Sequence, residues 1–159
     1  MGLDMYLYLE KYDSCSQYDK DFEKKRKNFY PKELKELEEN LLNYNFMSKT
    51  TQYQVAYWRK ANAIHRFFIN NCANGVDDCK PVWVSKKLQK ELVEKCREII
   101  ANPKKAMEEL PTQEGFFFGS QDYDEYYISD LEQTVEMLEP IVKFLEEHKG
   151  YSVIYEASW

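Results

Sequence analysis

Alternation of apolar and mostly polar residues near both ends of the chain constrains the fold most. In residues 3–10 every second residue is apolar, and in residues 151–157 Tyr, Val and Tyr alternate with Ser, Ile and Glu. A period of two is typical of a half-buried strand. Helical patterns dominate the sequence between these strands, so we predict an α+β fold. The expected architecture is a small, mostly antiparallel sheet with the N- and C-terminal strands adjacent, packed against four to five helices.

Two further strands and one turn are expected inside the chain. Residues 51–57 alternate again, and residues 82–84 (Val-Trp-Val) are a short strand candidate. Asn74-Gly75 is typical of a turn. These two strands and the turn separate the predicted helices from one another along the sequence.

The predicted helices are recognised by apolar spacing and by their capping residues. They are residues 31–43, residues 58–72, a helix capped by Ser85, a short helix starting at Asn102-Pro103, and a long helix capped by Asp122 with Glu125 that Pro140 should kink or split.

Composition narrows the class of protein. The chain has 159 residues, of which 43% are hydrophobic, and we predict a single globular domain over residues 1–159. A net charge of −6 disfavours binding to duplex DNA, which requires a basic surface. No apolar stretch approaches the length of a membrane span, and the start of the chain has no signal-peptide pattern. The four cysteines form no CxxC pair, so free thiols in a reducing cytoplasm are expected.

The segment from Trp58 to Phe68 carries the most informative polar residues. On a helix, His65 falls within the apolar arc, while Arg59, Asn62 and Arg66 lie beside it. In one interpretation His65 is a core histidine bonded to a carboxylate or a carbonyl, and the arginines hold loop carboxylates. In the other, the arginines and Asn62 bind an anion such as a phosphate, and His65 is a catalytic acid or base.

Asp77 and Asp78 are a weak candidate metal site. Adjacent carboxylates in a turn bind Mg²⁺ or accept hydrogen bonds from turn amides. A metal site would require another carboxylate, such as Asp124 or Glu125. The sequence indicates no particular cofactor.

The aromatic segment 110–127 also has two interpretations. Three phenylalanines between Gly115 and Gly119 either stack on a nucleobase or pack into the core. Ser120 and the amides of a helix N-terminus suit an anion, whereas the acidic residues of 122–125 oppose one. The candidate ligand-binding residues are Trp58, Arg59, Asn62, Arg66, Ser120 and Tyr123.

Several motifs together resemble a group of small uncharacterised proteins of bacteriophages, prophages and gut bacteria. The motifs are MGLDMYLY at the start, YWRKANxIH, NGVDDC, LPTQxGFFFGS, YDEYY and the terminal SW. The resemblance spans nearly the whole chain, except for residues 12–46. It implies a phage or mobile-element setting in the cytoplasm of a bacterial host, and it implies no mechanism.

Three functions stay open at this point. The first is an accessory binding protein that sequesters a nucleotide-like or other small anionic ligand, or that blocks a host defence protein. The second is a small metal-assisted phosphoesterase or nucleotide hydrolase, with His65 as catalytic residue and Arg59 and Arg66 on the phosphate. The third is a structural component of a virion or replication complex that works as a homo-oligomer. No P-loop, Rossmann, HExxH, GxSxG, EF-hand or kinase motif is present.

Overall fold

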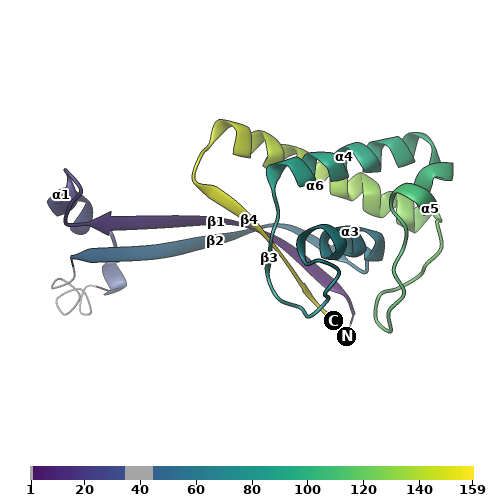
Figure 1. Ribbon diagram of the computed structural model, residues 1–159, viewed down its shortest axis with the longest axis horizontal. Coiled ribbons are helices and arrows are strands. Elements are labelled where there is room, and N and C mark those ends of the chain that lie inside the picture. Colours follow the sequence, from purple (N-terminus) through teal and green to yellow (C-terminus); the bar gives the residue numbers. More distant parts are fainter. Residues whose placement is uncertain (1, 35–44) are drawn as a thin grey trace. The chain divides into compact units, whose positions relative to one another are not determined.

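The computed structural model describes residues 2–34 and 45–159, and their strands form one antiparallel sheet (Figure 1). The strand order is β2-β1-β4-β3. The strands are β1 (Asp4–Ser16), β2 (Phe46–Arg59), β3 (Val82–Trp83) and β4 (Tyr151–Ser158). The first and last strands are therefore neighbours, and the predicted α+β fold is confirmed.

Most of the helices lie where the sequence predicts them. The helical elements are α1 (Phe22–Arg26), η1 (Lys32–Leu34), α3 (Asn62–Cys72), α4 (Lys86–Ala101), η2 (Pro103–Lys105), α5 (Ala106–Glu109) and α6 (Glu125–Glu147). Of the helix predicted over residues 31–43, only η1 falls within the described residues. Pro140 lies inside α6 and does not split it.

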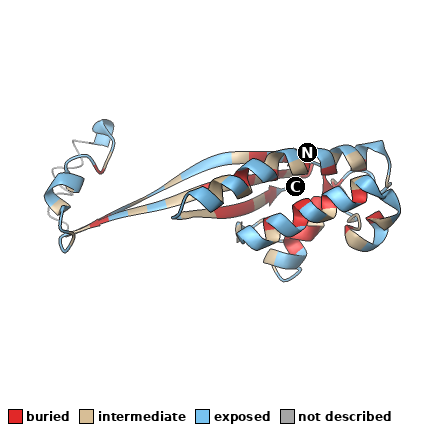
Figure 2. Cartoon of the chain, turned by 90° about the horizontal axis from the view of Figure 1, so that it is seen from above, coloured by how far each residue is buried: buried red, intermediate tan, exposed pale blue. Residues whose placement is uncertain are grey.

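The described chain divides into two compact units, and the first contains Met1–Glu10 and Gln52–Trp159. Its hydrophobic core joins the sheet to α3, α4 and α6, and Figure 2 shows buried residues concentrated where these elements meet. At its centre the rings of Phe68 and Tyr155 stack with centroids 4.3 Å apart. Burial of such side chains is the main stabilising contribution to this unit.

The second unit, Lys11–Thr51, has a small core of its own. Cys15, Phe29 and Met47 are its buried apolar residues. Lys49 donates a 2.9 Å hydrogen bond to the Phe29 carbonyl and lies over the Phe29 ring. The single globular domain that we expect over residues 1–159 stays a prediction, since the chain divides into these two compact units.

The predicted helix over residues 58–72 is wrong at its start. Strand β2 continues to Arg59, and α3 begins only at Asn62. Ala56 and Trp58 are both buried, so the inward alternation of the strand extends through Trp58. The Trp58 indole donates a 2.9 Å hydrogen bond to Thr134 of α6, which fixes the end of the strand against that helix.

The predicted cap of the long helix is also displaced. Asp124, not Asp122, is the N-cap of α6, and its carboxylate accepts hydrogen bonds from the amides of Tyr126 and Tyr127. Asp122 instead accepts a 2.9 Å hydrogen bond from the Ser120 hydroxyl. A capping carboxylate must precede the first helical residue, which here is Glu125.

None of the helices in residues 2–34 and 45–159 combines the length and the apolar character needed to cross a bilayer.

Candidate functional site

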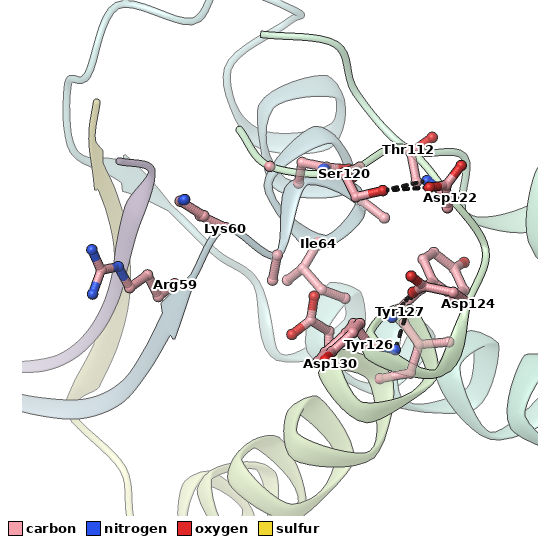
Figure 3. Close-up of a pocket in the computed structure, with 15 residues that line it drawn as sticks. Arg59, Lys60, Ile64, Thr112, Ser120, Asp122, Asp124, Tyr126, Tyr127 and Asp130 are labelled. Atoms are coloured by element: carbon pink, nitrogen blue, oxygen red, sulfur yellow. Dashed lines mark hydrogen bonds between the residues drawn. The ribbon is translucent and has the colours of Figure 1, made fainter. Parts of the chain in front are cut away.

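A cavity of about 330 Å³ lies within the first unit, between the start of α3 and the start of α6. Three segments of the chain line it (Figure 3): residues 59–64 at the β2–α3 junction, parts of the loop before α6, and the first turns of α6. The loop contributes Thr112, Gly119, Ser120, Asp122 and Asp124, and α6 contributes Tyr126, Tyr127, Asp130 and Leu131. Ala61, Ile64 and Leu131 contribute apolar surface, and most other lining residues are polar or charged. Its volume is at the lower end of the range of small-molecule pockets.

Lys60 makes the sharp turn that opens the cavity. Its φ of 61° lies in the left-handed region, which non-glycine residues rarely adopt. Its amide donates a 2.7 Å hydrogen bond to the Leu3 carbonyl. Gly119 accommodates the lysine on the opposite wall, since a Cβ there would lie 3.2 Å from the Lys60 Cβ. Unfavourable backbone conformations of this kind are often found at functional sites.

Asn62 fixes the loop wall of the cavity to α3. Its side-chain amide donates to the carbonyls of Phe118 (3.0 Å) and Ser120 (2.7 Å). Its Oδ1 accepts a 3.1 Å hydrogen bond from the Gln113 amide. Asn62 is buried and all these groups are paired, so it shapes the wall and has little capacity left for a ligand.

The β2–α3 side of the cavity carries positive charge. Arg59 and Lys60 both line it, and no salt bridge to either side chain occurs within the described residues. The N-terminus of α3 lies on the same side, and its cap residue Ala61 makes no side-chain hydrogen bond. Figure 3 shows the Arg59 guanidinium pointing away from Asp130, and the Lys60 ammonium lies on the same side as Arg59.

The α6 side carries an unpaired carboxylate. Asp130 is half-buried, and no described residue donates a hydrogen bond to its carboxylate. Burial raises its pKa from 3.8 to about 6, and the negative charge of Asp124 adds to the shift. Figure 3 shows this carboxylate pointing from α6 toward the first turn of α3. The cavity lining therefore combines two basic residues, Arg59 and Lys60, with three carboxylates, of which that of Asp130 is half-buried.

The structure brings together only part of the predicted site. Arg59, Asn62 and Ser120 line the cavity, whereas the other candidates lie elsewhere. Because Arg59 belongs to β2 and Arg66 to α3, the two arginines do not share one helix flank. Trp58 is 1% exposed and belongs to the core.

Arg66 and Tyr123 both hold the loop in place. Arg66 donates a 2.8 Å hydrogen bond to the Thr112 carbonyl, and the Tyr123 hydroxyl accepts a 3.3 Å hydrogen bond from the Thr112 amide. In the aromatic part of the loop, Phe118 is buried while Phe116 is 95% exposed. The core interpretation therefore applies to one ring of the three and not to Phe116.

His65 is fully buried and both of its ring nitrogens are engaged. Nδ1 lies 2.7 Å from the Tyr155 hydroxyl and Nε2 lies 2.8 Å from the Asp77 carboxylate. Asp77 also accepts a 3.2 Å hydrogen bond from the Trp159 indole. This arrangement matches the core histidine bonded to a carboxylate, and His65 does not line the cavity.

The two adjacent aspartates have separate partners. Asp77 binds His65, and Asp78 forms an ion pair with Lys80 that lowers the pKa of Asp78. Within the described part of the chain, no three His, Cys, Asp or Glu residues lie close enough together to hold a metal ion. Asp77 and Asp78 therefore have no third ligand there, and Asp124 and Glu125 do not supply one.

Sequence reasoning missed Lys60 and Asp130, two of the charged residues that line the cavity. Asp130 was detectable, because it lies three residues after Tyr127 and one before Leu131, inside the buried arc of α6. A charged residue in such an arc indicates a partner or a site. Lys60 gave no signal, since lysine has no preference for a left-handed backbone.

Comparisons with protein-family models, with curated proteins and with solved structures found no match for this chain.

Proposed function

We propose that this protein is a binding protein that holds a small dipolar ligand in the cavity between α3 and α6, without chemical turnover. The observation that carries the proposal is the half-buried Asp130 carboxylate, which faces the cavity with no hydrogen-bond donor from the described residues. A buried acceptor without a donor is unfavourable, and a ligand that donates to it removes this cost.

The ligand is inferred from the charges at the two sides of the cavity. Lys60 and the uncapped start of α3 suit an anionic or acceptor group. Asp130 suits an amino group. A nucleoside monophosphate whose base carries an exocyclic amine has both groups, and the exposed ring of Tyr126 at the cavity is suited to stacking.

Sequestration fits these groups better than hydrolysis. His65, the predicted acid or base, is outside the cavity and has both nitrogens engaged. Among the described lining residues the Ser120 hydroxyl donates to the Asp122 carboxylate, and no histidine lines the cavity beside this pair. We place this activity in the cytoplasm of a phage- or prophage-carrying bacterium on the strength of the sequence resemblance.

The test compares matched nucleotides by calorimetric titration and thermal shift. AMP and CMP present an exocyclic amine, whereas IMP and UMP present a carbonyl at the same position. We expect AMP and CMP to bind at least about tenfold more tightly than IMP and UMP. The carbonyl oxygen of IMP or UMP would face the Asp130 carboxylate, and two hydrogen-bond acceptors cannot pair with each other. At 100 times the dissociation constant the ligand should add about 2.7 kcal/mol to the free energy of unfolding.

Variants connect this binding to the cavity. Asp130→Asn should reduce the preference for AMP over IMP, and Lys60→Met should reduce the preference for AMP over adenosine. Glu132→Gln removes one charge from an exposed position on the same helix and should change neither preference. Mass spectrometry after incubation should recover intact nucleotide. The proposal is rejected if no nucleotide binds, or if Asp130→Asn binds AMP and IMP in the same ratio as the unaltered protein.

A further inference from the structure

The sheet of the first unit has a second face, opposite the helices, that carries a band of aromatic side chains. Alternation directs Leu3, Leu7 and Trp58 into the core and their neighbours to the other side. We call this band the tyrosine face. Its aromatic members are Tyr57 of β2, Tyr6 and Tyr8 of β1 and Trp83 of β3, and β4 contributes Ile154, which is 5% exposed.

The strand order places members of the tyrosine face on all four strands of the sheet, and the buried Ile154 lies between the tyrosines of β1 and Trp83 of β3. The rings of Tyr6 and Tyr57 are 5.4 Å apart, and Tyr6 stacks on Tyr8 at 6.1 Å. On the other side Trp83 pairs with Ile154 in register. Trp83 is 64% exposed and Tyr57 is 38% exposed, so large apolar surface is in contact with solvent. Tyrosine and tryptophan are the residues enriched at the centres of protein interfaces.

Carboxylates accompany the tyrosine face. Asp4 and Glu10 are an even number of residues away from Tyr6 and Tyr8 in β1, so they lie on the same face of the sheet. In β4, Glu156 shares this face with Ile154 for the same reason. Asp4 accepts a 2.5 Å hydrogen bond from the Tyr57 hydroxyl. Burial raises the pKa of Tyr8, and the negative charge of Glu156 on the neighbouring strand β4 contributes to this rise. Three carboxylates therefore lie on this face.

These charges decide between the possible occupants. Arg59 lies two residues after Tyr57 in β2, so its side chain is on the same face of the sheet. With one arginine and three carboxylates, the charges described on this face are negative overall. A second copy would bring the same carboxylates against it, and the whole chain has a net charge of −6. A nucleic acid would likewise bring negative charge. A lysine- or arginine-rich segment complements the carboxylates and makes cation–π contacts with the tyrosines.

We propose that the tyrosine face is a docking surface for a basic, arginine- or lysine-containing segment of another protein. The segment lies across β2, β1, β4 and β3, with its cations near Asp4, Glu10 and Glu156 and its apolar side chains on the rings. Tyr57, Tyr6, Tyr8, Ile154 and Trp83 do not line the α3–α6 cavity, and Arg59 at the end of β2 is common to the cavity and this face. It operates whether or not the cavity binds a nucleotide.

The test uses defined peptides and the full chain. Fluorescein-labelled peptides with alternating arginine and leucine, alternating lysine and leucine, and alternating glutamate and leucine are titrated with the protein by fluorescence anisotropy at two salt concentrations. We expect the basic peptides to bind at least about tenfold more tightly than the acidic one, with affinity falling as salt rises. Equal binding of basic and acidic peptides would overturn the proposal.

Variants test the location of the binding. Tyr8→Ala and Trp83→Ala, the second at an exposed residue of the edge strand β3, should each lower the affinity for the basic peptides about tenfold. Tyr57→Phe keeps the aromatic ring and should bind these peptides with unchanged affinity. Tyr18→Ala is the matched control, because Tyr18 is 86% exposed and lies in the other unit. Unchanged affinity in Trp83→Ala, which leaves the core intact, rejects this surface. Sedimentation showing a dimer that Trp83→Ala disrupts would assign the face to a second copy and reject the basic partner.

Discussion

Replacing Asp130 by asparagine should stabilise the protein at neutral pH and lose this effect in mild acid. Burial raises the pKa of Asp130 from 3.8 to about 6, so the folded state retains the proton to a higher pH than the unfolded state does. The stability due to the protonated carboxyl is present below the unfolded pKa and is lost as the pH rises through about 6. At neutral pH the folded protein therefore holds a charged carboxylate in an unfavourable place.

The magnitude follows from the pKa difference. Two pKa units correspond to about 3 kcal/mol, and solvent screening at a half-buried site reduces this to about 1–2 kcal/mol. Asp130→Asn should raise the free energy of unfolding by that amount at pH 7.5. For a chain of this size the Tm should rise by about 3–6 °C. At pH 4 the gain should approach zero, because the native carboxyl is then already neutral.

Urea unfolding at pH 7.5, 6 and 4 measures this dependence directly. Glu132→Gln on the exposed side of α6 is the control, and it should shift stability little at any of these values. Equal stabilisation by Asp130→Asn at pH 7.5 and pH 4 would show that the effect is steric and would refute the electrostatic reasoning. Destabilisation at pH 7.5 would show that the carboxylate has a donor.

Three further substitutions test the loop, the core histidine and the wall glycine. Asn62→Ala removes the three hydrogen bonds of the buried Asn62 side chain and should lower the free energy of unfolding by about 3 kcal/mol in urea titrations; a loss below 1 kcal/mol would contradict its anchoring role. His65→Leu leaves the Tyr155 hydroxyl and the Asp77 carboxylate without this partner, and should cost about 3 kcal/mol in the same assay, whereas a neutral result would reject the core role. Gly119→Ala introduces a side chain at a φ of 89° and should cost about 1–3 kcal/mol, seen as a lower Tm; an unchanged Tm would show that the loop relaxes freely.

The general fold was predictable from the sequence because it depends on simple periodicities. The alternation of residues 3–10 and 151–157 identified the two central strands, and Ser85 identified the start of α4. Of the pairings between strands, one was predicted from the sequence, that of the first strand with the last. Whether the strand before α3 ends at residue 57 or residue 59 depends on the turn at Lys60, which no local preference indicates.

The site was less predictable because it depends on which distant segments meet. Asn62 and Ser120 were singled out as ligand-binding residues, yet they bind each other through the Ser120 carbonyl. A sequence shows the capacity of a polar side chain for hydrogen bonds, and only tertiary structure shows whether protein groups already fill it. The same reason separates His65, whose nitrogens are both engaged, from Asp130, whose carboxylate has no donor from the described residues.

The link from Asn62 to the loop also has a kinetic consequence. The Gln113 amide hydrogen is held by the Asn62 side chain, so it exchanges with solvent deuterium only when that link breaks. Its protection factor therefore measures how often one wall of the cavity opens. Amide exchange at this single position gives the opening equilibrium of the cavity before any ligand has been identified.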